Sequence, residues 1–84
     1  MAPPIADSAP TGDELTDYDR EHLVDYLRLL DAAEEGAEWR EVAKIVLGLD
    51  PDQDPERVRK CHESHLARAR WLSAEGYREL LRKG

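Results

Sequence analysis

The sequence of 84 residues predicts an all-α fold, a small helix-turn-helix-like bundle of three main helices with a short C-terminal helix. Three observations lead to this prediction. Apolar residues recur at helical spacing in three stretches, glycine follows the first two, and an Asp-Pro step opens the third. We expect a folded domain over residues 16–84. Residues 1–15 are rich in proline and small polar side chains without periodicity, which predicts a disordered arm.

The first helix is predicted from about Tyr18 to Glu35. Thr16 and Asp19 resemble a capping box in which aspartate replaces the usual glutamate, and Gly36 supplies a stop. Its apolar stripe is formed by Leu23, Tyr26, Leu27 and Leu30. Its outer face gathers acidic residues around Arg28: Glu21, Asp25, Asp31 and Glu35. Such a face is typical of a solvated surface, and alternatively it could dock a basic partner.

A second helix is predicted from about Glu38 to Leu47 and ends at Gly48. The segment LGLDPDQDP then forms a long turn, because each Asp-Pro step disfavours helix at the preceding residue. The third and central helix is predicted over Asp54 to Leu72, with Asp54 as its cap and Pro55 in its first turn. A short final helix is expected over Tyr77 to Arg82. We expect Gly76 to end the central helix, although a new helix capped by Ser73 is an alternative.

The central helix has two distinct sides. One side should pack in the core and consists of Val58, Cys61, His62, His65, Ala69 and Leu72. The opposite side gathers Lys60, Glu63, Ser64, Ala67 and Trp71, with arginines along its flanks at positions 57, 59, 68 and 70. This helix should therefore bury one stripe and offer the other to a partner.

Cys61, His62 and His65 have the residue types of a metal site, and positions 61 and 65 are spaced to face one ion. No matching pair occurs elsewhere, and all three fall on the predicted core face. We therefore expect packed core residues and no metal. No triad, phosphate loop or acidic dyad is visible, so we expect no enzyme activity, no cofactor and no small-molecule substrate.

Charge is distributed unevenly along the chain. Residues 1–54 carry fifteen acidic and four basic residues, residues 55–84 carry four acidic and eight basic ones, and the total is −7. Such asymmetry concerns partners more than fold. Neither a signal segment nor an apolar run of membrane-spanning length is visible, and the single cysteine suits a reducing compartment. A soluble, cytoplasmic protein without membrane contact is expected.

Helix, long turn, helix is the outline of a helix-turn-helix, in which Asp54 to Leu72 would be the recognition helix. Its basic flanks, Arg57, Arg59, Lys60, Arg68 and Arg70, could meet phosphates or base edges. Glu56, Glu63 and the acidic first two thirds oppose this reading. From charge we therefore expect DNA binding to be weak or absent.

The stretches DREHLVDYLRLLDA, WREVAKIVLGLDP and HLARARWLSAEGYRELL resemble the RovC-like DNA-binding domain family over about Asp17 to Leu81. The family occurs in bacterial regulators, including a type VI secretion activator, and on integrative and conjugative elements. A short acidic member is similar to the small antiactivators that those elements encode. That resemblance implies a helix-turn-helix-like fold that binds transcriptional activators: a LuxR-type quorum-sensing regulator or an activator of excision.

The sequence is therefore compatible with two functions. The first is an antiactivator that inhibits a transcriptional activator controlling transfer of a mobile element. Its partner-binding residues are predicted to be Arg57, Lys60, Ser64, Ala67 and Trp71. The rival surface is the acidic face around Glu21 and Asp25. The alternative function is a small helix-turn-helix DNA-binding transcriptional regulator.

Overall fold

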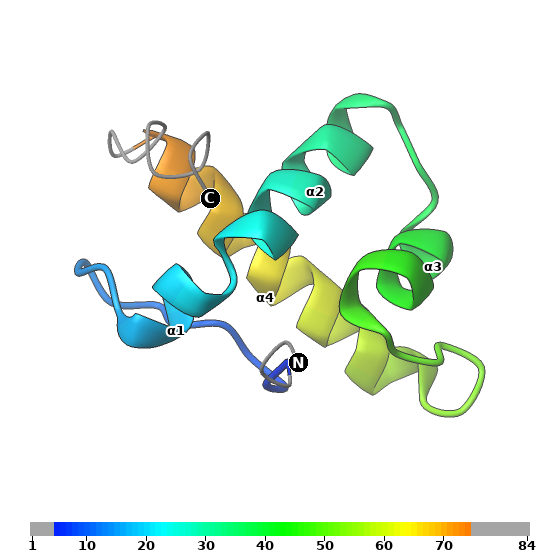
Figure 1. Cartoon of the computed structure of the whole chain (residues 1–84). Coiled ribbons are helices and arrows are strands. Elements are labelled where there is room, and N and C mark those ends of the chain that lie inside the picture. The colour runs from blue at the N-terminus through cyan, green and yellow to red at the C-terminus, as the bar shows by residue number, and fades with distance from the viewer. Residues whose placement is uncertain (1–4, 75–84) are drawn as a thin grey trace.

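The computed structural model describes residues 5–74 as a helical domain (Figure 1). Its elements are α1 (Asp17–Glu21), α2 (Leu23–Glu34), α3 (Trp39–Val42), the π-helical turn η1 (Ala43–Leu47) and α4 (Pro55–Ala74). The predicted all-α, helix-turn-helix-like class is confirmed. The helix expected over Tyr77 to Arg82, and the stop expected at Gly76, lie outside the described residues.

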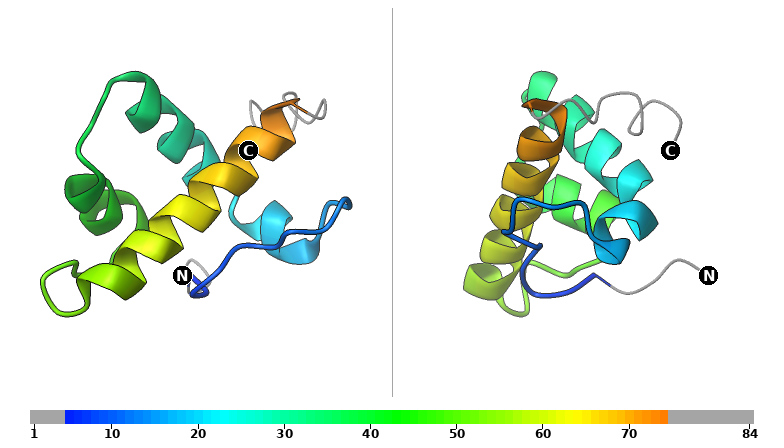
Figure 2. Two further views of the ribbon diagram at one scale, coloured as in Figure 1. Left: turned by 180° about the vertical axis from the view of Figure 1, so that it is seen from behind. Right: turned by 90° about the vertical axis from the view of Figure 1, so that its left-hand side faces the viewer.

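The long helix α4 is the central element of the domain (Figure 2). It packs against α2, α3 and η1, which lie together along one side of it, and α2 also contacts η1. The buried cluster between them draws on all of these elements: Tyr26, Leu29, Val42, Leu47, Cys61, Ala69 and Leu72. The apolar stripes read from the sequence thus meet in one core, because each amphipathic helix must cover its apolar face.

The first predicted helix is broken into two. The capping box is present: the Thr16 Oγ1 accepts the Asp19 backbone N–H, and the Asp19 carboxylate accepts the Thr16 N–H. At His22, however, the backbone leaves helical geometry (φ −113°, ψ 21°), so α1 and α2 are separate elements. The prediction of one continuous helix is therefore wrong at this residue. His22 is buried, and its Nδ1 lies 2.9 Å from the Asp25 carboxylate.

Both predicted glycine stops are confirmed. Gly36 and Gly48 have φ of 72° and 66°, a left-handed backbone that glycine adopts without steric cost. After Gly36, the Ala37 N–H donates to the Ala32 carbonyl, as in a Schellman motif. After Gly48 the chain turns through residues 49–54 into α4, and the Asp54 carboxylate accepts the Arg57 N–H at 3.3 Å.

The N-terminal strap (residues 5–11) runs along α4 in an irregular, non-helical conformation (Figure 2). Ala9 is 5% exposed, and its N–H donates to the Ser64 Oγ at 3.1 Å. The division into an arm over residues 1–15 and a domain over residues 16–84 stays a prediction. The described part of that arm nevertheless makes defined contacts with the folded helices.

Candidate nucleic-acid interface

The first half of α4 carries an exposed basic cluster, formed by Arg57, Arg59 and Lys60. These residues stand on the outward side because the inward positions of the same turns, Val58 and Cys61, are buried in the core. Arg59 pairs with Glu63 one turn later at 3.1 Å, and both side chains remain well exposed. Lys60 makes no ion pair with any described residue. Side chains that are exposed in this way can exchange an internal partner for a phosphate at little cost.

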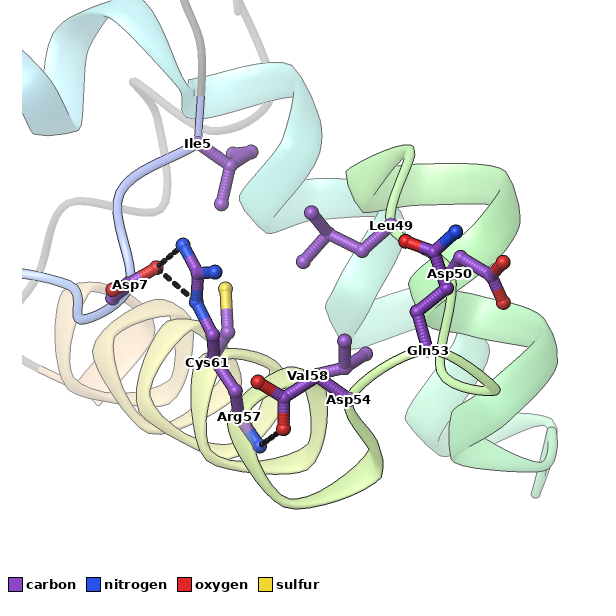
Figure 3. Close-up of a pocket in the computed structure, with 9 residues that line it drawn as sticks. All are labelled: Ile5, Asp7, Leu49, Asp50, Gln53, Asp54, Arg57, Val58 and Cys61. Carbon is purple, nitrogen blue, oxygen red and sulfur yellow. Dashed lines mark hydrogen bonds and ion pairs between the residues drawn. The ribbon is translucent and has the colours of Figure 1, made fainter.

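Arg57 is engaged by the N-terminal strap. Its Nε and Nη2 atoms donate to one oxygen of Asp7 at 2.9 and 2.7 Å. The hydrogen bonds to Asp7 raise the pKa of the Arg57 guanidinium above its ordinary value, because the carboxylate stabilises the charged form. Figure 3 shows the pair at the edge of a cavity of about 160 Å³, which lies between the strap, the turn after Gly48, and α4.

The five residues predicted to bind a partner, Arg57, Lys60, Ser64, Ala67 and Trp71, form a continuous row on α4, called here the α4 row. The strap follows this row in the same chain direction. Asp7 pairs with Arg57, Ser8 lines a surface pocket with Lys60, and Ala9 bonds Ser64. Pro10 and Thr11 line a further pocket with Ala67 and Trp71. That the row binds a partner stays a prediction; in the structure its neighbour is the N-terminal strap.

Arg68 is not available to a ligand. The sequence placed it among the basic flanks that could meet phosphates, but its side chain is 3% exposed. Its Nε and Nη2 bind the two oxygens of Asp19 at 3.0 and 2.7 Å, and its guanidinium also donates to the carbonyls of Gly12 and Glu14. The assignment to the flank is therefore wrong, because a buried carboxylate holds the guanidinium inside the domain.

Asp19 is the other half of this buried pair and was assigned only a capping role by the sequence. Burial by itself would raise the pKa of Asp19. Hydrogen bonds from Arg68, from the Thr16 backbone N–H and from the Tyr26 hydroxyl outweigh it and lower that pKa to about 2. The pair joins α1 to α4 and fixes residues 12–14. No local sequence pattern indicates it, because the partners lie 49 positions apart.

Trp71 is half-buried, so it is less outward than the sequence suggested. The Arg68 guanidinium lies 4.1 Å from the centre of its ring, a cation–π arrangement. The indole therefore forms the end wall of the α4 row, next to Ala67 and Thr11. In this position it can be contacted from one side.

The placement of Cys61, His62 and His65 in the core is confirmed, with exposed fractions of 2%, 8% and 1%. His65 donates from Nδ1 to the Cys61 carbonyl at 2.7 Å and therefore accepts the Tyr18 hydroxyl at Nε2. Burial lowers the pKa of both His62 and His65 and raises that of the Cys61 thiol. Within residues 5–74, no group of three or more potential ligands is arranged to hold a metal ion.

The other helix of the motif, α3 with η1, presents a mixed surface. Arg40 stacks on Trp39 at 4.8 Å and pairs with Glu38. Lys44 is exposed, and Ile45 is 77% exposed. On the rival acidic surface, Glu21 is exposed, whereas Asp25 is partly covered and held by His22. No described helix is long and apolar enough to cross a membrane.

The bundle and the exposed basic helix after its long turn define a helix-turn-helix-like domain. Residues 4–82 match the model of the RovC DNA-binding domain family, described as "T6SS, Transcription factor, DNA binding domain". The chain belongs to this family. No curated protein matched the sequence. The matched range begins at residue 4, so it includes the N-terminal strap.

Membership of this family corrects one prediction. DNA binding was expected to be weak or absent, whereas the family is one of DNA-binding domains. The expectation gave too much weight to the net charge of the chain. Asp19 is buried and neutralised by Arg68, while Arg57, Arg59 and Lys60 stand together on one exposed turn. A local basic cluster acts on DNA within a Debye length of about 8–10 Å, largely independently of acidic residues beyond that range. Glu56 and Glu63 share the turns of the cluster and offset only part of its charge.

Proposed function

We propose that this chain is a DNA-binding domain of transcription regulation and that α4 is its recognition helix. The family match over residues 4–82 carries the proposal. The geometry supports the assignment of α4 as the recognition helix. This helix follows α3 and η1 through a turn, and its outward side faces away from the core. A helix presented in this way suits the major groove, where the N-terminal residues of a recognition helix contact the bases.

The exposed basic cluster of α4 is assigned the contacts. Arg59 and Lys60 lie on the first two turns of the helix, where base edges are within reach. Arg57, on the flank next to the strap, is placed to meet a phosphate. Lys44, exposed on η1, is suited to the backbone on the other side of the groove.

The test starts from a selection of duplexes out of a random-sequence library with the full chain. Fluorescence anisotropy then gives the affinity for the selected duplex. Arg59→Ala and Lys60→Ala should each weaken binding by about tenfold or more if they contact bases. Arg20→Ala, which removes the same charge from α1, should change the affinity by less than about twofold.

Two results would contradict this proposal. One is that no duplex is enriched by the selection. The other is that all three variants lose the same affinity, because a uniform loss would reflect net charge and not an interface on α4.

A second candidate function is a QseM-type antiactivator, which would bind a transcriptional activator through the α4 row. The observation that favours it is the strap, since a row that already accommodates an extended polypeptide could accept another. Under this candidate, Trp71→Ala should weaken binding of the activator more than Arg57→Ala, because an aromatic anchor contributes more than a rim charge. Co-purification with a tagged copy in the native host provides the measurement. If no transcriptional activator is recovered with the tagged chain, the antiactivator candidate is contradicted.

A further inference from the structure

We propose that the N-terminal strap is an autoinhibitory segment in which Asp7 occupies the place of a DNA phosphate on Arg57. The inference rests on the proposed function and specifies how that site is regulated. An Asp carboxylate and a phosphate oxygen are both anionic acceptors for a guanidinium. The Asp7 oxygen takes two of the donors that Arg57 would give to a phosphate.

The strap is attached firmly at one end and weakly at the other. Residues 12–14 are fixed by Arg68, which binds the carbonyls of Gly12 and Glu14 inside the domain. Towards residue 5, the Asp7–Arg57 pair is about two thirds exposed on both sides. Exposed pairs of this kind contribute little free energy and are screened by salt. The firm attachment therefore keeps the strap close to α4, and the weak one allows it to open.

Packing beneath the strap is incomplete. Ile5, Asp7, Arg57 and Cys61 surround the cavity of about 160 Å³ (Figure 3). A second surface pocket, of about 340 Å³, lies between Ser8 and Lys60. Hollows on both sides of Asp7 mean that lifting Asp7 and Ser8 gives up few van der Waals contacts, whereas Ile5 gives up its packing against the edge of the core. A duplex that approaches Arg57 and Lys60 can therefore replace the strap.

Within the described part of the chain, three polar contacts besides the ion pair hold the closed strap. The Ala6 N–H donates to the Tyr18 hydroxyl at 3.0 Å, and the Ala6 carbonyl accepts the Cys61 thiol at 3.3 Å. The Ala9 N–H donates to the Ser64 Oγ. Cys61 is therefore covered in the closed state, and its thiol becomes more accessible when residues 5–8 lift. This provides a measure of opening that needs no DNA.

The first experiment measures opening directly. The rate at which a thiol reagent modifies Cys61 is compared between the intact chain, Asp7→Asn and Asp13→Asn. Asp13 is exposed, follows the strap by two residues and forms no ion pair with any described residue, so its variant is a matched control for charge. Loss of the Arg57 contact should raise the rate for Asp7→Asn about threefold, with Asp13→Asn close to the intact chain. Equal modification rates in the two variants would contradict the proposal that the Asp7–Arg57 pair holds the strap closed.

The second experiment measures the consequence for DNA with the selected duplex. Asp7→Asn should bind about three- to fivefold more tightly than the intact chain, and Asp13→Asn should stay within about twofold. In an Arg57→Gln background, the gain from Asp7→Asn should fall to that of Asp13→Asn, because the competing pair is already gone. If Asp7→Asn still increases DNA affinity in the Arg57→Gln background, general charge repulsion is the cause, and the proposal that the strap is autoinhibitory is wrong.

Failure of the proposed function gives a different result. If none of the variants, including Asp7→Asn, binds any duplex, both proposals are wrong. If all variants bind DNA and Asp7→Asn behaves like Asp13→Asn, the DNA-binding proposal stands and only the strap is wrong.

Discussion

At the scale of residues, the buried pair of Arg68 and Asp19 has the largest structural consequence. The guanidinium satisfies a carboxylate from α1, two carbonyls that precede α1, and the face of Trp71. The Tyr26 hydroxyl donates at 2.9 Å to the Asp19 oxygen that also accepts the Arg68 Nε. The Arg68–Asp19 pair therefore joins α1, α2, α4 and residues 12–14.

Replacing Arg68 should be far more damaging than replacing its exposed neighbour. Arg68→Ala leaves the Asp19 carboxylate buried without its cationic partner, which typically costs about 3–5 kcal/mol of folding free energy. Arg70→Ala removes the same charge from an exposed position of α4 and should change stability little. Urea denaturation followed by circular dichroism measures both. Equal midpoints for the two variants would show that the buried pair contributes nothing to stability.

The burial of individual residues can be predicted from the sequence where the signal is local. The core face of α4 was predicted correctly, because burial follows the 3.6-residue period at Val58, Cys61 and His65. Arg68 falls near the edge of that face, and arginine is ordinarily placed in solvent. Only the tertiary contact with Asp19 moves it inside, and no single segment contains both partners.

At the scale of elements, two glycine stops define the lengths of the first two helical stretches, and a long turn separates η1 from α4. The positions of the two glycine stops could be predicted because the left-handed backbone conformation that ends a helix favours glycine. The break at His22 could not, since no glycine or proline marks it. It accompanies a fully buried histidine held by Asp25, an arrangement that depends on how α1 and α2 pack against α4.

Gly48 should tolerate substitution less well than Gly12. Both have open space where the Cβ of an alanine would stand, so neither substitution causes a steric clash. Gly48, however, has φ of 66°, where an L-residue with a Cβ is strained by about 1 kcal/mol or more. Gly48→Ala should therefore lower the thermal midpoint, while Gly12→Ala should not. Similar losses in both variants would show that backbone strain is not the cause.

At the scale of the whole molecule, charge is distributed unevenly in space as well as along the chain, although Asp54 and Glu56 line one surface pocket with Arg57 and Lys60. The acidic residues of α1 and α2 belong to the body, while α4 carries the exposed basic cluster at its first turns. The sequence indicated this asymmetry but could not show that the strap brings Asp7 onto Arg57, because the strap has no periodicity. A charge count also cannot distinguish a neutralised carboxylate such as Asp19 from one that repels DNA.

The central claim is that the outward side of α4 is the DNA interface. An NMR titration of the isotope-labelled full chain with the selected duplex, followed amide by amide, tests it most directly. The largest shifts should fall on residues 56–63 and on strap residues 6–9, with little change at Glu21 and along the outer face of α2. Shifts confined to α1 and α2, or no shifts at a duplex concentration well above the dissociation constant, would contradict the account.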